Sequence, residues 1–323
     1  MEKPFYVFLT LYFCVFSFAK AEQIQIQICN RAPMRMDLPV ESFGSSASSM
    51  VSLMTAYHSA SDVAVALGKE VKVPGKFVYG FLAEGLKGEI VELWMDDCSG
   101  SLQLVGRHKT DGEGNSLHEI DLSEIPGPGE YQIYQRVVGD NTLVQSTLRV
   151  LPEKTQMIVF DIDETLTTAN SEMLYEVLEK ILEQKYMPKA RLGAEKITQF
   201  FREKGYQVVY LTARHHMLTN LSREWLRDLD FAPGTLVLAQ SVSQMLNPAD
   251  YKAMVMKNLK DQDFILKAAY GNATTDIVAY QEVGIPKKQT YIMGMHGGGG
   301  NTVALGEDFL GHLSYLLNDG SVF

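Results

Sequence analysis

The spacing of apolar and polar residues divides the chain into two parts. From about Gln23 to Leu151, short apolar runs show the two-residue period of half-buried strands, and turns rich in glycine, proline, asparagine and aspartate separate them. The runs lie at 23–28, 76–81, 90–94, 131–134 and from 142 onward. Several short strands with this punctuation predict an all-β, sandwich-like domain. The stretch between Ser45 and Ala66 is rich in serine and alanine and is compatible with a helix or with a loop.

A different pattern begins after Leu151-Pro152-Glu153, where short apolar runs alternate with amphipathic helical segments. The expected strands cover 157–160, 207–211, 236–239, 264–270 and 289–293. The expected helices cover 171–184, 194–204, 218–228, 248–259, 275–283 and 308–317. This alternation predicts an α/β fold in which a Rossmann-like parallel sheet carries helices on both faces. We therefore expect a β-rich, sandwich-like domain at 22–151 and an α/β domain at 152–323.

The first 21 residues have the features of a targeting segment. Lys3 precedes an apolar run at 5–18, and Ala19-Lys20-Ala21 offers the small-x-small pattern of a cleavage site. The run is shorter than the roughly 20 residues that a spanning helix needs. We therefore interpret 1–21 as a signal peptide and expect an exported protein, secreted or periplasmic, with an uncleaved membrane anchor as the alternative. In an exported protein, Cys29 and Cys98 permit one disulfide, and two free thiols are equally compatible with the sequence.

Composition and charge narrow the classes of partner. The 323 residues are 46% hydrophobic and 21% charged, as in ordinary globular proteins, and the formal net charge is -10. A general affinity for nucleic acid is therefore not expected. An anionic substrate would have to be attracted by local basic residues and a bound cation.

The most informative residues follow the first strand of the α/β region. Asp161 and Asp163 stand two residues apart, and Thr165 follows them. One carboxylate of such a pair can attack phosphorus while the other transfers protons. A magnesium ion between the carboxylates and a phosphate would offset the repulsion between these groups. Taken alone, the motif is equally compatible with a polar turn.

Three further segments lie at the expected strand ends or helix starts. After the second strand come Thr212, Ala213 and Arg214, where a hydroxyl and backbone N–H groups can donate to a phosphate. Lys252 begins the fourth helical pattern and offers an ammonium for a carboxylate and a phosphate oxygen. After the fourth strand, Asn272 and Asp276 offer oxygen ligands for magnesium. Each segment alone also fits a helix cap or a surface charge, and we interpret the adjacent His215-His216 pair as part of a solvated loop.

Together, the order and spacing of these four motifs resemble the haloacid dehalogenase-type phosphatases. More closely, 157–294 resembles the lipin-type phosphatidate phosphatase domain, which also occurs at the C-terminus of membrane-associated phosphatidylinositol transfer proteins. The resemblance covers a little under half of the chain and leaves out the β-rich part. It rests on the segments 161–167, 205–214, 268–272 and 276–285, and for the transfer-protein branch in particular on 251–254.

The resemblance implies a role for each motif. Asp161 would be the nucleophile that forms an aspartyl-phosphate, and Asp163 would protonate the leaving alcohol and then activate water. Asp161, the backbone carbonyl of Asp163 and Asp276 would hold Mg²⁺. The remaining roles would fall to Thr212 and Lys252 as phosphoryl-binding residues, Asn272 as a further metal ligand, and Thr165, Ala213 and Arg214 as substrate-binding residues.

Two departures from the family pattern bear on function. Glu164 stands where these families usually have glycine, and a helical segment of about 20 residues, expected between Ser171 and Pro188, follows the first motif. Because both aspartates are present, we expect a Mg²⁺-dependent phosphatase that acts on phosphatidic acid or a related phospholipid, with peripheral membrane contact. The alternatives are a phosphatidic-acid-binding module without turnover and a phosphatase for small soluble phosphomonoesters.

Overall fold

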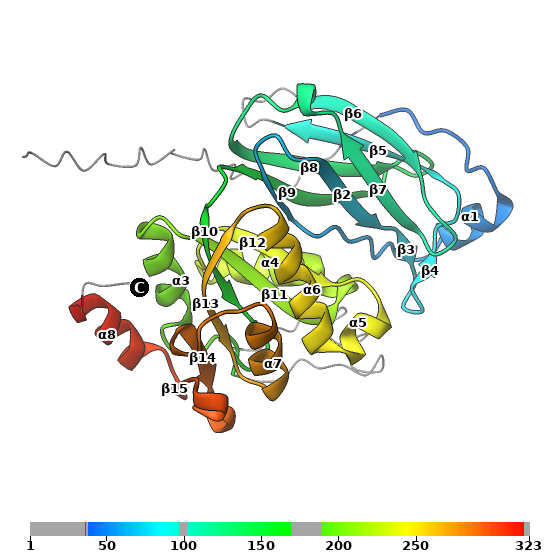
Figure 1. Ribbon diagram of the computed structural model, residues 1–323. Coiled ribbons are helices and arrows are strands. Elements are labelled where there is room, and N and C mark those ends of the chain that lie inside the picture. The colour runs from blue at the N-terminus through cyan, green and yellow to red at the C-terminus, as the bar shows by residue number, and fades with distance from the viewer. Residues whose placement is uncertain (1–35, 37, 97–101, 169–188, 320–323) are drawn as a thin grey trace, which may run out of the picture.

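The computed structural model describes residues 36, 38–96, 102–168 and 189–319. A β-sandwich precedes an α/β domain built on a parallel sheet (Figure 1). The expected strand at 23–28, the expected helix at 171–184 and both cysteines that follow the N-terminal segment lie outside the described residues. None of the helices within these ranges is long and apolar enough to span a bilayer.

The sandwich packs a mixed five-stranded sheet against a two-stranded one. The larger sheet has the order β1-β9-β8-β5-β6, in which only β1 and β9 pair in parallel. Alternate side chains of β2 and β7, such as Val71, Val73 and Ile120, meet side chains of the larger sheet such as Leu93 and Ile133 in one core. The elements of this region are α1 (Ser46–Val51), β1 (Val63–Ala66), β2 (Val71–Lys76), β3 (Val78–Tyr79), β4 (Glu84–Gly85), β5 (Ile90–Asp96), β6 (Leu102–Lys109), β7 (Asn115–Ile120), β8 (Gly129–Val137) and β9 (Leu143–Leu151).

The second region is a six-stranded sheet with every pair parallel, in the order β12-β11-β10-β13-β14-β15. Its strands are β10 (Gln156–Phe160), β11 (Gln207–His215), β12 (Gly234–Ala239), β13 (Ile265–Gly271), β14 (Thr290–Met293) and β15 (Val303–Gly306). Its helices are α3 (Ala194–Glu203), α4 (Thr219–Asp228), α5 (Val242–Leu246), α6 (Pro248–Asp261), α7 (Thr274–Glu282) and α8 (Leu310–Asp319). The predicted α/β architecture and the predicted β-sandwich are both confirmed.

Helices cover both faces of the parallel sheet, which explains why its strand β10 is apolar from Met157 to Phe160. Met157 and Val159 of β10 point into a core shared with α6 and α7. Ile158 and Phe160 point the other way, into a core shared with α3 and α4. A strand buried on both faces reads as a continuous apolar run, because neither set of alternating side chains meets water.

The two regions are joined through Asp62, which lies just before β1. Its N–H donates to the carbonyl of Leu236 in β12, and its carboxylate accepts from the N–H of Leu236 and of Thr147 in β9, each at 3.0 Å. The guanidinium groups of Arg149 and Arg223 approach the same carboxylate at 3.3 and 2.8 Å. Burial alone would raise the pKa of Asp62, but these two cations outweigh it and hold the pKa below its ordinary value.

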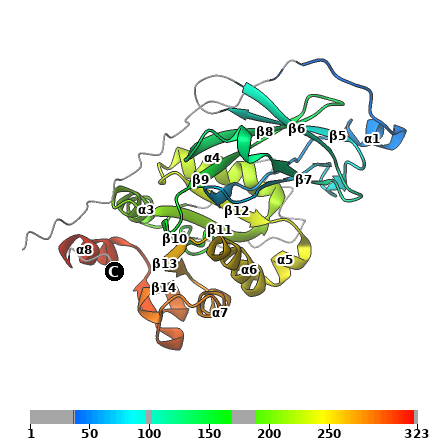
Figure 2. The same ribbon diagram turned by 45° about the horizontal axis from the view of Figure 1, so that its top comes forward.

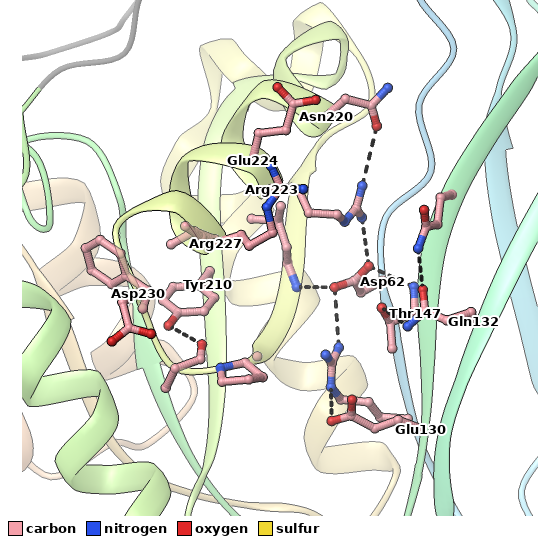
Figure 3. A pocket seen from close by; sticks show the side chains of 18 of the residues that line it. Asp62, Glu130, Gln132, Thr147, Tyr210, Asn220, Arg223, Glu224, Arg227 and Asp230 are labelled. Carbon is pink, nitrogen blue, oxygen red and sulfur yellow. Dashed lines mark hydrogen bonds and ion pairs between the residues drawn. The ribbon is translucent and has the colours of Figure 1, made fainter. Parts of the chain in front are cut away.

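A cavity of about 470 Å³ lies beside this junction, between β8, β9, α4 and the start of β12 (Figure 3). Its wall includes Arg223 and Asn220 from the α/β domain and Gln132 and Thr147 from the sandwich. The ionic side chains at the junction bond to one another, as Arg149 does with Glu130 at 3.1 Å. The charges of Asp62, Arg149, Arg223 and Glu130 in this wall thus help to hold the two domains together.

We predict that Asp62→Ala lowers the free energy of unfolding by about 3–5 kcal/mol, because it leaves Arg149 and Arg223 without their shared buried partner. Urea denaturation monitored by tryptophan fluorescence measures the change. The matched control is Asp228→Ala, which removes a carboxylate that is 63% exposed and paired with Arg227 on the surface. That control should cost less than about 1 kcal/mol, and equal costs for the two variants would contradict the role of Asp62.

Candidate functional site

The candidate site lies where the strand order of the parallel sheet reverses. The chain runs from β10 to β11 and β12 on one side, and then crosses to β13, β14 and β15 on the other. The loops that leave β10 and β13 therefore diverge and open a crevice at the carboxyl ends of these strands. Asp161 directly follows β10 and Asn272 directly follows β13, and Phe160 pairs with Tyr270 in register.

Asp161 is buried and bound on both carboxylate oxygens. Lys252 Nζ donates to Oδ1 at 2.6 Å, and Thr165 Oγ1 donates to Oδ2 at 3.0 Å. Burial raises the pKa of Asp161 to about 7, and Lys252 opposes this rise. The nearby carboxylates of Asp276 and Asp163 add to it. Lys252 is thus the main group that stabilises the charged form of this buried carboxylate, and a cation at the site would add to that effect.

Lys252 joins the two acidic sides of the crevice. Its ammonium, on α6, also donates to Asp276 Oδ1 at 2.6 Å, and its side chain is only 6% exposed. Burial alone would lower the pKa of Lys252, but the flanking Asp161 and Asp276 hold it above the ordinary value, so the ammonium stays charged. Asp276 Oδ2 accepts from the N–H groups of Asn272 at 2.9 Å and Ala273 at 3.0 Å, which fixes the carboxylate at the start of α7.

Two backbone positions bring these groups close. A Cβ at Gly271 would lie 2.6 Å from the Cβ of Asp276, so a side chain there would displace the carboxylate. Glu164 has a φ of 52°, in the left-handed region that favours glycine, at the position where the resembling families have glycine. Its carbonyl accepts from Arg191 Nε and its carboxylate accepts from Asn272 Nδ2, both at 3.0 Å, and these contacts hold the loop in that conformation.

Asp163 faces a different set of partners from Asp161. Arg214 Nε lies 3.0 and 2.9 Å from its two oxygens, and Thr212 Oγ1 donates to Oδ2 at 2.9 Å. The expected phosphate-binding residues Thr212 and Arg214 are thus close to the aspartate pair, but both contact Asp163. Ala213, between them, is half-buried. The residues of the four motifs therefore lie close together in the structure. The motifs alone did not indicate that Thr212 and Arg214 contact Asp163.

The donor set at the crevice fits Mg²⁺ in its chemistry. Asp161, Asp276, Asn272 and the carbonyl of Asp163 all offer oxygen, which is what this ion prefers. Across the described residues, however, no group of three or more His, Cys, Asp or Glu side chains is arranged to hold a metal on its own. Mg²⁺ is commonly held by one or two carboxylates together with water and a substrate phosphate, so this set is compatible with an ion that shares its ligands with the substrate.

The interpretation of His215 and His216 as a solvated loop is wrong. Both side chains are buried, at 4% and 2% exposure, because residues 58–62 of the sandwich side lie over them. His216 Nδ1 lies 3.0 Å from Ser59 Oγ, and His215 Nδ1 accepts from the N–H of Met217 at 3.4 Å. Burial, with smaller contributions from His215 and Lys76, lowers the pKa of His216 to about 2. The sequence carries no signal for this contact, since 157 positions separate its two partners.

Comparison with known families identifies both regions. Residues 158–294 match the family model described as "PITM 1-3, LNS2 domain". Residues 56–150 match the model described as "PITM 1-3, beta-sandwich domain". The chain contains the β-sandwich and LNS2 domains of this family. The resemblance to the lipin-type domain of membrane-associated phosphatidylinositol transfer proteins is therefore confirmed.

Individual relatives agree with this assignment. Human membrane-associated phosphatidylinositol transfer protein 3 is 30% identical over 245 residues, which are 75% of this chain and 24% of that protein. Protein retinal degeneration B of Drosophila melanogaster is 29% identical over 269 residues, which are 81% of this chain and 20% of that protein. The chain therefore spans about a fifth to a quarter of these relatives. A crystal structure of Parabacteroides merdae β-glucuronidase aligns over 82% of this chain and 38% of its own, with 10% identity and a TM-score of 0.23, which is too low to support an argument.

The expectation of an exported protein is wrong. The proteins that carry the matching domains are named as membrane-associated transfer proteins, which contradicts a secreted or periplasmic location. The residues on which that expectation depended, 1–21, lie outside the described part of the chain.

We predict that Lys252→Met lowers the free energy of unfolding by about 3–5 kcal/mol, because Asp161 and Asp276 would then be buried without their shared counter-charge. Chemical denaturation at neutral pH measures the loss. Lys257→Met is the matched control on the same helix, since Lys257 pairs with Glu282 at side-chain exposures of 53% and 42%. It should change stability by less than about 1 kcal/mol. A Lys252 variant as stable as this control would contradict the buried triad.

We also predict that acid destabilises the protein through His216. Its pKa is about 2 in the folded state and 6.5 for an exposed histidine, so the unfolded chain binds the proton more tightly. The stability contributed by the neutral ring is therefore complete above pH 6.5 and is lost as the pH falls below it, by up to about 1.4 kcal/mol per pH unit. Urea unfolding of wild type and His216→Gln at a series of pH values measures this slope. An unchanged slope in the variant would contradict the assignment.

Proposed function

We propose that this chain is a Mg²⁺-dependent phosphatase of the haloacid dehalogenase type that acts on phosphatidic acid or a related phospholipid. The observation that carries the proposal is the pair Asp161 and Asp163 at the reversal point of the sheet, with each carboxylate held by its own cation. Lys252 lies 2.6 Å from Asp161, and Arg214 lies 2.9 Å from Asp163. Two carboxylates in separate environments can take separate roles in acid–base and nucleophilic chemistry.

The proposed reaction uses these residues in two steps. A carboxylate oxygen of Asp161 attacks the phosphorus, the bond from phosphorus to the ester oxygen breaks, and Asp163 donates a proton to the leaving alcohol. A water molecule then gives a proton back to Asp163 and attacks the phosphorus of the aspartyl-phosphate. Inorganic phosphate leaves, and the Asp161 carboxylate is regenerated. Lys252 stays charged throughout and orients the nucleophile.

Asp161, Asp276, the carbonyl of Asp163 and Asn272 would hold Mg²⁺. When bound, this ion supplies charge neutralisation for the phosphoryl oxygens. Arg214 and Thr212 contact Asp163 and lie at the same edge, so the arrival of a phosphate gives both donors an alternative anionic acceptor. Their exchange from Asp163 to the phosphate would allow Asp163 to take up the proton that it must donate.

Support for a lipid substrate comes from the relatives, whose names place phosphatidylinositol transfer and membrane association in proteins with the same two domains. A second candidate is a module that binds phosphatidic acid without turnover. The contact of Arg214 Nε with both oxygens of Asp163 favours it, because both oxygens already face a guanidinium group instead of being free to meet a leaving alcohol.

The test is phosphate release from vesicles that contain phosphatidic acid, with and without Mg²⁺, beside a soluble aryl phosphate. We expect Mg²⁺-dependent release by the wild type, none by Asp161→Asn, and a loss of about 10²–10⁴-fold in Asp163→Asn, which lacks the proton donor. Asp250→Asn is the matched control, since Asp250 is exposed on the same helix as Lys252 and should leave the rate unchanged.

The pattern of outcomes separates the candidates. Release from the aryl phosphate alone would identify a phosphatase for soluble phosphomonoesters. Binding of phosphatidic acid vesicles without release from any substrate would reject the enzyme and leave the binding module.

A further inference from the structure

The most exposed large apolar side chains of the described residues come from segments along one side of the molecule. Five of them are more than 70% exposed: Met50 at 71%, Leu53 at 87%, Leu82 at 84%, Leu246 at 75% and Met295 at 91%. A single exposed leucine needs no explanation, because much of any protein surface is apolar. Five such side chains on separate elements of both domains do need one.

Two of the five side chains lie on segments that leave the parallel sheet at its carboxyl edge. Leu246 ends α5, which follows β12, and comes shortly before α6 with its Lys252. Met295 lies in the short turn Gly294–His296 directly after β14. Both therefore flank the crevice at the same ends of the strands as Asp161.

The other three come from the sandwich, whose β3–β4 hairpin reaches the same edge. Val78 of β3 is buried in the core that also contains Met217 and Leu218, directly after β11. Leu82 lies at the tip of this hairpin, between β3 and β4. Met50 and Leu53 lie in or just after α1, and this segment is tied to the hairpin because Gly80 N donates to the carbonyl of Thr55 at 2.8 Å.

The ribbon diagrams show how the elements that carry these side chains are arranged. In Figure 1, α1, the β3–β4 region, α5 and α7 follow one another along the right and lower side of the molecule, and in Figure 2 α1, α5 and α7 keep this order, whereas α8 lies on the left in both views. This side will be called the apolar edge, defined by Met50, Leu53, Leu82, Leu246 and Met295.

We propose that the apolar edge docks this protein on a lipid bilayer, with its five side chains inserted between the headgroups around the mouth of the site. The inference rests on the proposed function, since a phosphate carried by a membrane lipid must be reached at the bilayer surface. Isolated side chains on short turns and helix ends suit a bilayer, into which each inserts independently, better than a protein partner, which needs a continuous complementary surface. Net charge does not provide the attraction, because the chain carries -10.

The test is sedimentation of the full chain with vesicles of phosphatidylcholine alone and of phosphatidylcholine with phosphatidic acid. The edge variant carries Leu82→Glu, Leu246→Glu and Met295→Glu. The matched control carries Leu67→Glu, Leu122→Glu and Leu317→Glu, which change side chains of 47%, 46% and 63% exposure away from the edge. We expect the edge variant to lose at least about tenfold in its partition to both vesicles, and the control to bind as the wild type does.

Three further measurements test bilayer docking independently of the phosphatase activity: activity on a soluble substrate, binding at high salt, and the oligomeric state. Both variants should release phosphate from a soluble aryl phosphate at the wild-type rate, and binding to phosphatidylcholine should persist at about 0.5 M salt, where charge attraction is screened. Edge and control variants that bind equally, or binding that salt abolishes, would overturn the docking surface even if the phosphatase is active. Dimerisation of the wild type without vesicle binding would overturn it too, in favour of a contact between copies. A chain that binds through its edge and releases no phosphate would reject only the enzyme.

Discussion

The architecture of the site depends on one buried ammonium. Lys252 lies 2.6 Å from Asp161 and from Asp276, which come from the ends of β10 and the start of α7. Neither carboxylate could be buried beside the other without a counter-charge, since both are nearly inaccessible to water. The contact therefore fixes three elements relative to one another: the loop after β10, the N-terminal part of α6 and the N-terminus of α7. It also leaves the trio with one net negative charge, which suits the divalent cation that the proposed function requires.

The sandwich contributes to this arrangement through a second set of buried charges. Asp62 ties the strand that enters the sandwich to β12 and, through Arg223, to α4. The adjoining residues 58–61 cover the end of β11, where Ser59 contacts His216. The two domains are thus held as one body near the edge where Asp161 and Asp163 lie. These contacts fix the position of the β3–β4 hairpin relative to the α/β domain. A flexible linker between the domains would not.

Much of the α/β domain was predictable, because its elements are long or fully apolar. In the α/β domain, the boundaries of the expected strands and helices that lie in the described residues are within two residues of the observed ones, apart from the end of β11, which extends four residues further, to His215. Neither α5 nor β15 was expected, because both are short and carry polar or glycine residues, so neither shows a clear period. The parallel pairing of β1 with β9 was not visible either, since the pairing joins residues 85 positions apart, as in Val63 with Leu148.

The site was predictable in its membership and not in its contacts. Asp161, Asp163, Lys252 and Asp276 were placed together because strand ends of a parallel sheet share one edge. Arg214 contacts Asp163, and the other domain covers His215 and His216. Both contacts depend on segments that are distant in the sequence. A local sequence pattern indicates where polar residues lie, but it does not indicate which residue forms a hydrogen bond or an ion pair with each of them.

The net negative charge of the chain and the anionic membrane substrate proposed for it set opposing requirements, and the two proposals together assign them to different groups. Attraction of the phosphate would fall to two buried cations, Lys252 and Arg214, which burial shields from salt. Approach to the bilayer would fall to the apolar edge, whose contribution is independent of the sign of the surface charge. Because the side chains of the apolar edge come from both domains, their relative positions depend on the junction at Asp62, although Asp62 is not among them.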